Sequence, residues 1–66
     1  MNAMPTPPGL SITELEEVYD ELAQAIDAAG PEKAQLFLVK LALLDAQALG
    51  DVEAFRRNLA AALRDL

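Results

Sequence analysis

Carboxylates crowd the first half of the chain, and they are the groups most able to do chemistry. Magnesium and calcium bind carboxylate oxygens, but carboxylates spread along one exposed helix face do not converge on a cage. No Gly-containing calcium loop accompanies them, so we predict no metal site. We interpret these residues as a solvated acidic face, or alternatively as a surface for a basic partner protein. The candidate acidic face consists of Glu14, Glu17, Asp20 and Glu21.

Isolated polar side chains offer little more for catalysis. Asp45 stands in an otherwise apolar stretch, but general acid–base sites usually pair two carboxylates or add a His, and the chain has no His. We interpret Asp45 as one half of an ion pair or as the edge of an interface. Ser11 and Thr13 fit helix caps better than nucleophiles, and Tyr19 is expected to bury its ring. We therefore predict that the protein is not an enzyme and holds no cofactor.

Composition and charge exclude several other classes of protein. The absence of Cys and His rules out disulfides and ordinary zinc sites. The formal net charge of −6 argues against a nucleic-acid binder or a protein held on an anionic membrane. Lys33, Lys40 and Asp45 interrupt the one strongly apolar stretch, which argues against a transmembrane helix. The N-terminus lacks the basic and apolar regions of a secretory signal, so we expect a cytoplasmic protein.

The chain as a whole predicts three helices behind a tail. Residues 1–9 hold three of the four prolines, which favours a flexible Pro-rich tail. The capping-box spacing of Ser11 and Glu14, followed by apolar residues at helical intervals, indicates a helix over about 11–29. Gly30 and Gly50 are expected to end the first and second helices in the left-handed αL conformation.

The second and third helices are expected to follow these glycines directly. Pro31 suits the first position of a helix over 31–49, and Asp51 suits the cap of a helix over about 52–64. Short connections make consecutive helices antiparallel neighbours. The predicted fold is all-α, with one domain over residues 10–66 made of three antiparallel helices with short Gly-containing turns.

The helix predicted over 31–49 carries more apolar surface than two neighbours can cover. At 100° per residue, Lys33, Lys40 and Gln47 form one narrow polar stripe. Roughly three quarters of the circumference is apolar or small, against the ~100° stripe of an ordinary surface helix. A sector that neither neighbour covers is therefore expected to meet another chain. The candidate interface residues are Leu36, Val39, Leu43, Leu38, Ala42 and Asp45.

The charges suggest how the helices align. In antiparallel register Lys40 comes level with the acids of the first helix, and Asp45 comes level with Arg56. We therefore expect ion pairs of Lys40 with those acids, and of Asp45 with Arg56 or Arg57. Exposed pairs contribute about 0–1 kcal/mol, so these pairs would set register more than stability.

The segment from Leu43 to Asp51, with the Leu-rich residues 36–42 before it, resembles a family of short bacterial all-helical proteins of unknown function. The likeness covers roughly Tyr19 to Ala62. Gly50-Asp51 matches that family, whereas Gln47-Ala48 replaces its Asn-His and Asp45 stands where the family has an apolar residue. The resemblance implies a bacterial, cytoplasmic protein without catalytic activity, or alternatively an accessory subunit that docks on a flavin-dependent enzyme.

These patterns together predict a non-catalytic protein–protein interaction module. The leading expectation is self-association through the second helix, with a twofold homodimer favoured because a symmetric contact would bury the remaining apolar sector. The alternatives are an accessory subunit that docks on a bacterial enzyme and an acidic-face binder of a basic partner. We expect neither nucleic acid nor a membrane among the partners.

Overall fold

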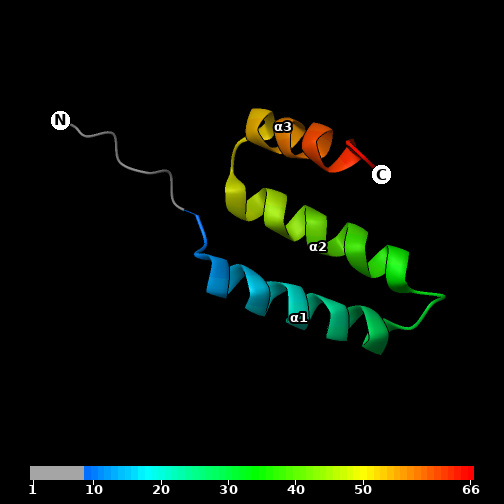
Figure 1. Cartoon of the computed structure of the whole chain (residues 1–66). Coiled ribbons are helices and arrows are strands. Elements are labelled where there is room, and N and C mark those ends of the chain that lie inside the picture. Colours follow the sequence, from blue (N-terminus) through cyan, green and yellow to red (C-terminus); the bar gives the residue numbers. More distant parts are fainter. Residues whose placement is uncertain (1–8) are drawn as a thin grey trace.

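A computed structural model describes residues 9–66, which form three helices joined by short turns (Figure 1). The helices are α1, Ile12–Ala29, α2, Ala34–Leu49, and α3, Val52–Leu63. Consecutive helices run antiparallel, and residues 9–66 contain no strand. The prediction of an all-α fold of three helices is confirmed. The Pro-rich tail predicted for residues 1–9 lies, except for Gly9, outside the described residues.

The start of α1 follows the predicted capping box. The Ser11 hydroxyl accepts a hydrogen bond from the Glu14 N–H at 3.1 Å, and Glu14 Oε1 accepts one from the Ser11 N–H at 2.9 Å. The first backbone N–H groups of a helix have no hydrogen-bond partner inside the helix. The capping box gives a partner to one of them, the Glu14 N–H, and also to the N–H of the cap residue Ser11. Thr13, the other residue considered as a cap, lies inside α1.

The connection between α1 and α2 differs from the prediction. Gly30 has φ 82° and ψ 160°, which is a glycine conformation other than αL. The Lys33 N–H donates to the Gly30 carbonyl at 3.1 Å and closes a turn. Pro31 takes the second position of this turn, which suits its fixed φ. The predicted helix start at Pro31 is therefore wrong, and α2 begins at Ala34.

The connection between α2 and α3 agrees with the prediction. Gly50 adopts the αL conformation, with φ 69° and ψ 21°, and its N–H donates to the Ala46 carbonyl at 3.0 Å. Asp51 Oδ1 accepts hydrogen bonds from the N–H groups of Glu53 and Ala54, at 3.0 and 3.1 Å. The turn therefore ends one helix and caps the next within two residues.

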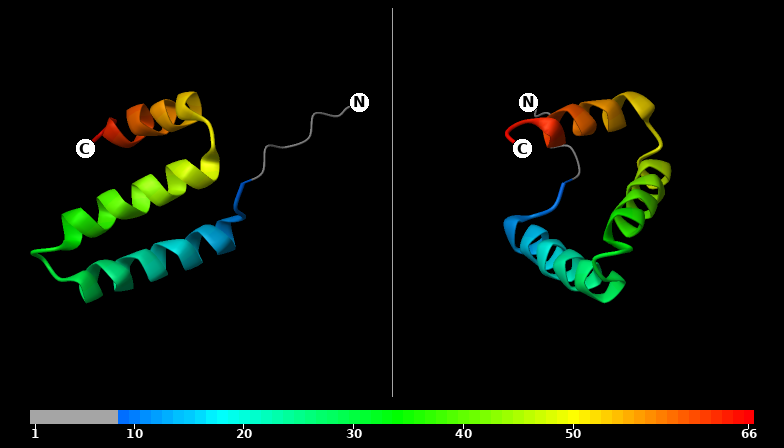
Figure 2. Two further views of the ribbon diagram at one scale, coloured as in Figure 1. Left: turned by 180° about the vertical axis from the view of Figure 1, so that it is seen from behind. Right: turned by 90° about the vertical axis from the view of Figure 1, so that its right-hand side faces the viewer.

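The central helix holds the fold together. α1 and α3 each contact α2, chiefly beside the turns that join them to it, and no Cα atom of α1 lies within 8 Å of one in α3. Figure 2 shows the three helices arranged around an open side. As a consequence no residue from 9 to 66 is buried. The structure is an open bundle in which even the best-covered side chains are only half-buried.

Candidate interaction surface

The half-buried residues mark where the helices meet. Between α1 and α2 they are Leu22, Ala25, Ile26, Ala29, Ala34, Phe37 and Leu41, and between α2 and α3 they are Ala46, Ala54 and Phe55. The contact between α2 and α3 thus involves small side chains around one aromatic ring. α2 uses two separate arcs of its circumference for its neighbours, and the rest of the helix is exposed.

The candidate interface residues of α2 fall on two different sides of the helix. At about 100° per residue, Leu36, Val39 and Leu43 form one row, and Leu38, Ala42 and Asp45 form another that points more than about 100° away. All six residues are exposed, with 58% exposure for Leu36 and 64% for Leu43. A single flat partner cannot cover both rows, so the predicted interface separates into two surfaces.

An apolar groove lies along α2 and meets the C-terminal end of α1 at Ala29. It has a volume of about 330 Å³, and two lysines lie among otherwise apolar side chains along it. Its lining residues are Ala29, Lys33, Leu36, Phe37, Lys40, Leu41 and Leu44. Leu44 lines the groove beside Phe37 and Leu41 and is 67% exposed. The groove therefore offers an apolar floor with positive charge beside it.

The ion pairs expected between helices are not formed. Among residues 9–66 the only ion pair joins Arg56 to Glu53 within α3, at 2.6 Å. Lys40 has no carboxylate within 4 Å, and Asp45 has no basic group within 4 Å. The physical reason is that an exposed pair gains little Coulomb energy in water and loses side-chain freedom. Both charges therefore remain open to groups from another molecule.

Asp45 lies in a second groove, between α2 and α3. This groove has a volume of about 350 Å³ and is lined by Ala42, Asp45, Ala46, Leu49, Phe55 and Asn58. Among the described residues that line it, Asp45 is the one carboxylate. Its geometry fits the interpretation of Asp45 as the polar edge of an apolar contact surface.

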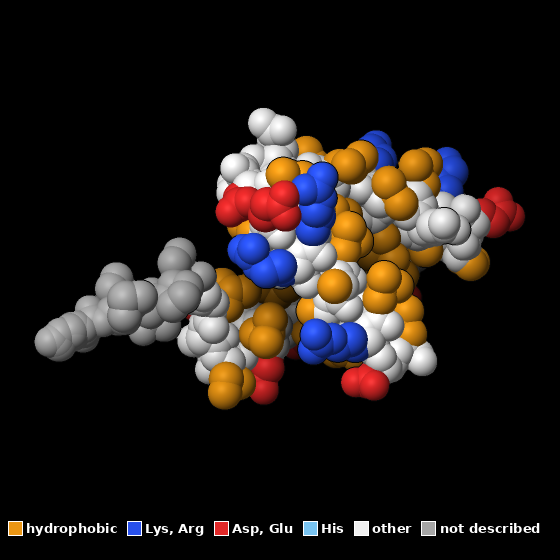
Figure 3. All heavy atoms as spheres, turned by 90° about the horizontal axis from the view of Figure 1, so that it is seen from above, with side chains coloured by type: hydrophobic (Ala, Val, Ile, Leu, Met, Phe, Trp, Pro, Cys, Tyr) orange, Lys and Arg blue, Asp and Glu red, His pale blue; other side chains and the backbone are white. Residues whose placement is uncertain are grey.

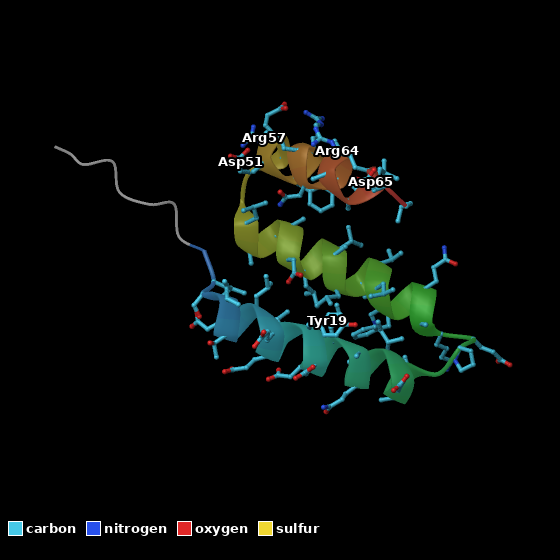
Figure 4. The ribbon with its side chains drawn as sticks, in the orientation of Figure 1. Tyr19, Asp51, Arg57, Arg64 and Asp65 are labelled. Carbon is cyan, nitrogen blue, oxygen red and sulfur yellow. The ribbon has the colours of Figure 1, made fainter. Side chains whose placement is uncertain are left out.

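The candidate acidic face also divides in the structure. The Glu14 carboxylate is engaged in the capping box, whereas Asp20 lies beside Tyr19 in a shallow hollow on one edge of α1. Glu17 and Glu21 lie on the other edge, one helical turn apart. Arg57 lies on α3 and Arg64 follows its C-terminal end, and neither forms an ion pair with an acid of α1 (Figure 4).

The expectation that Tyr19 buries its ring is wrong. Tyr19 is 72% exposed and lies on α1 with Ile12 and Leu15, which are also exposed (Figure 4). The pattern of α1 alone could not reveal this, because helical spacing marks an apolar face but not whether a third helix covers it. Since α3 does not reach α1, this edge stays open.

The surface as a whole is rich in hydrophobic side chains. Seen from above, they lie over much of the molecule, between scattered Lys and Arg side chains (Figure 3). Contiguous apolar patches larger than a few hundred Å² are rare on soluble monomers and mark protein or membrane contacts. No helix within residues 9–66 has both the length and the apolar character needed to cross a membrane.

Between residues 9 and 66, no three carboxylate, His or Cys side chains gather where they could hold a metal ion. Comparisons with known protein families, curated proteins and solved structures found no match to this chain.

Proposed function

We propose that this chain is a non-catalytic protein–protein interaction module that self-associates through α2, most simply as a twofold homodimer in the bacterial cytoplasm. The observation that carries the proposal is the absence of any buried side chain from residue 9 to residue 66. A fold of this size depends on burying a large share of its apolar surface. Since one copy buries so little, a second copy is the simplest source of the missing core.

The row formed by Leu36, Val39 and Leu43 supports α2 as the associating element. These side chains are 49–64% exposed although they belong to the central helix of the fold. Burying one such leucine fully contributes roughly 1.5–3 kcal/mol. A symmetric contact counts each residue twice, so burying this row in a dimer offsets part of the free-energy cost of bringing two chains together.

Light scattering coupled to size exclusion at low micromolar protein tests this proposal. We expect a mass of about twice the 7.1 kDa of one chain. Replacing Leu36 and Leu43 together by Lys should shift the protein to the monomer mass. The matched control replaces Leu63 and Leu66, which are even more exposed leucines near the end of α3, by Lys. A wild-type monomer at this concentration would contradict the proposal.

A second candidate function is an accessory subunit that docks on a bacterial enzyme, for which the family resemblance suggests a flavin-dependent one. The supporting observation is that two grooves, one on each side of α2, remain open. One symmetric contact covers only one of them. Co-purification of the tagged chain from its native host should then recover one enzyme in fixed stoichiometry, and its absence would leave self-association as the function.

The acidic face gives a third candidate, which is binding of a basic partner. Glu17 and Glu21 lie exposed on a helix without a basic residue, and neither makes an ion pair within the described chain. Such binding would weaken as salt is added and would be lost when both residues become Gln. Binding that is insensitive to salt would argue against it.

A further inference from the structure

We propose that a second copy of the chain covers the lysine-bearing side of the α1–α2 pair, with α1 of each copy lying over α2 of the other. This inference rests on the proposed self-association and adds the face and the orientation of the contact. The inference follows from the charged residues that the fold places on one side of the antiparallel pair α1 and α2.

The geometry of the pair places acids and lysines on the same side. In a pair of antiparallel right-handed helices, some residues of each helix face the other helix. The residue directly before each of these points to the side of the pair, and it is the same side for both helices. Glu21 precedes the half-buried Leu22 of α1, and Lys40 precedes the half-buried Leu41 of α2. The groove residue Leu36 likewise precedes Phe37.

Further residues, one helical turn along each helix, lie on this same side of the pair. Glu17 lies one turn before Glu21, and Lys33 and Leu44 line the groove together with Leu36 and Lys40. We call this surface the hairpin face, and its residues are Glu17, Glu21, Lys33, Leu36, Lys40 and Leu44. Within residues 9–66 none of its four charged groups takes part in an ion pair.

The hairpin face is complementary to itself. It carries two acids on α1 and two lysines on α2, with exposed leucines beside the lysines. A contact between two identical faces has a twofold axis, so every pairing occurs twice. A second copy laid on this face can therefore bring Glu21 of each copy to Lys40 of the other and close the assembly as a dimer, with Lys33 about 10 Å farther along the axis of α2 beside the turn.

The charges also choose between the two possible twofold arrangements. A twofold axis along the helices places α1 over the partner's α2, so that Glu21 of each copy meets Lys40 of the other. A twofold axis across the helices places α1 over the partner's α1, so that acids meet acids. Because like charges in contact disfavour an interface, the arrangement with α1 over α2 is selected.

Charge reversal on each side of the contact tests this inference. One variant carries Glu17→Lys and Glu21→Lys, and the other carries Lys33→Glu and Lys40→Glu. Each variant alone brings like charges together in both halves of the dimer, so we expect its dissociation constant to rise at least about tenfold. An equimolar mixture restores opposite charges in both halves and should return the affinity to within about threefold of wild type. Sedimentation equilibrium measures the dissociation constants of the two variants and of their mixture.

Matched controls change the same charges on other faces. Glu16→Lys with Asp20→Lys alters the edge of α1 that carries Tyr19, and Arg57→Glu with Arg64→Glu alters α3. Neither pair should change the dissociation constant more than about threefold. The mixture also protects against misfolding, because two chains that fail to fold alone would regain helical circular dichroism and dimer mass together.

The outcomes separate this inference from the proposed function. A wild-type monomer overturns both. A wild-type dimer that survives each reversal, or that is lost without recovery in the mixture, overturns the hairpin face and leaves self-association in place. Equal weakening by the control variants overturns it as well, because the effect would then follow net charge. Loss in each variant with recovery in the mixture supports it.

Discussion

At the scale of single residues, local hydrogen bonds were predictable and exposure was not. The caps of α1 and α3 depend on side chains two or three residues from the backbone N–H groups that they bind. The spacing of these residues in the sequence was therefore sufficient to predict the capping hydrogen bonds. Tyr19 shows the opposite case, because its exposure depends on where α3 lies, and nothing near Tyr19 in the sequence determines that.

The Ser11 cap gives a prediction at this scale. Ser11→Ala removes the hydroxyl that accepts the Glu14 N–H and should lower the free energy of unfolding by about 1 kcal/mol. Thr13→Ala, inside the same helix, should cost less than about 0.5 kcal/mol. Urea denaturation followed by circular dichroism, at one fixed protein concentration, compares the two. An equal cost for both changes would mean that Ser11 is not the functional cap.

At the scale of the elements, the number, type and order of the helices followed from the sequence. Periodic apolar residues and two glycines define the three segments, and the structure agrees at the ends marked by those glycines. The start of α2 was misplaced because proline at a helix start and proline in a tight turn look alike in sequence. Only the hydrogen bond from Lys33 to Gly30 distinguishes them.

The two turn glycines should respond differently to substitution. A Cβ at either position would have no atom within 4 Å, so the cost lies in the backbone conformation alone. Gly50 is αL, and Gly50→Ala should cost about 1–2 kcal/mol. Gly30, with ψ 160°, lies where side chains are rarely tolerated, so Gly30→Ala should cost more, up to about 3 kcal/mol. Thermal unfolding of both variants ranks them, and the reverse order would contradict the turn geometry.

At the scale of the whole molecule, the sequence indicated excess apolar surface but not where it lies. The angular count on α2 predicted a sector that two neighbours leave uncovered, and the structure leaves surface exposed on both sides of that helix. The separation of α1 from α3 was not predictable, because a helix that is apolar around most of its circumference accepts neighbours at many angles. The predicted interface consequently divides into two rows, and Leu36, from the row with Val39 and Leu43, also lies on the hairpin face that we assign to the contact between copies.

The dependence of thermal stability on protein concentration tests the central claim, that this chain completes its fold with a second copy. When folding is coupled to dimer formation, the midpoint of unfolding rises with concentration by mass action. Between about 1 and 100 μM we expect the Tm from circular dichroism to rise by roughly 5–10 °C. The Leu36→Lys, Leu43→Lys variant should be largely unfolded over the same range. A wild-type Tm that stays constant across this hundredfold change would show that a single copy is stable alone, and would contradict the account.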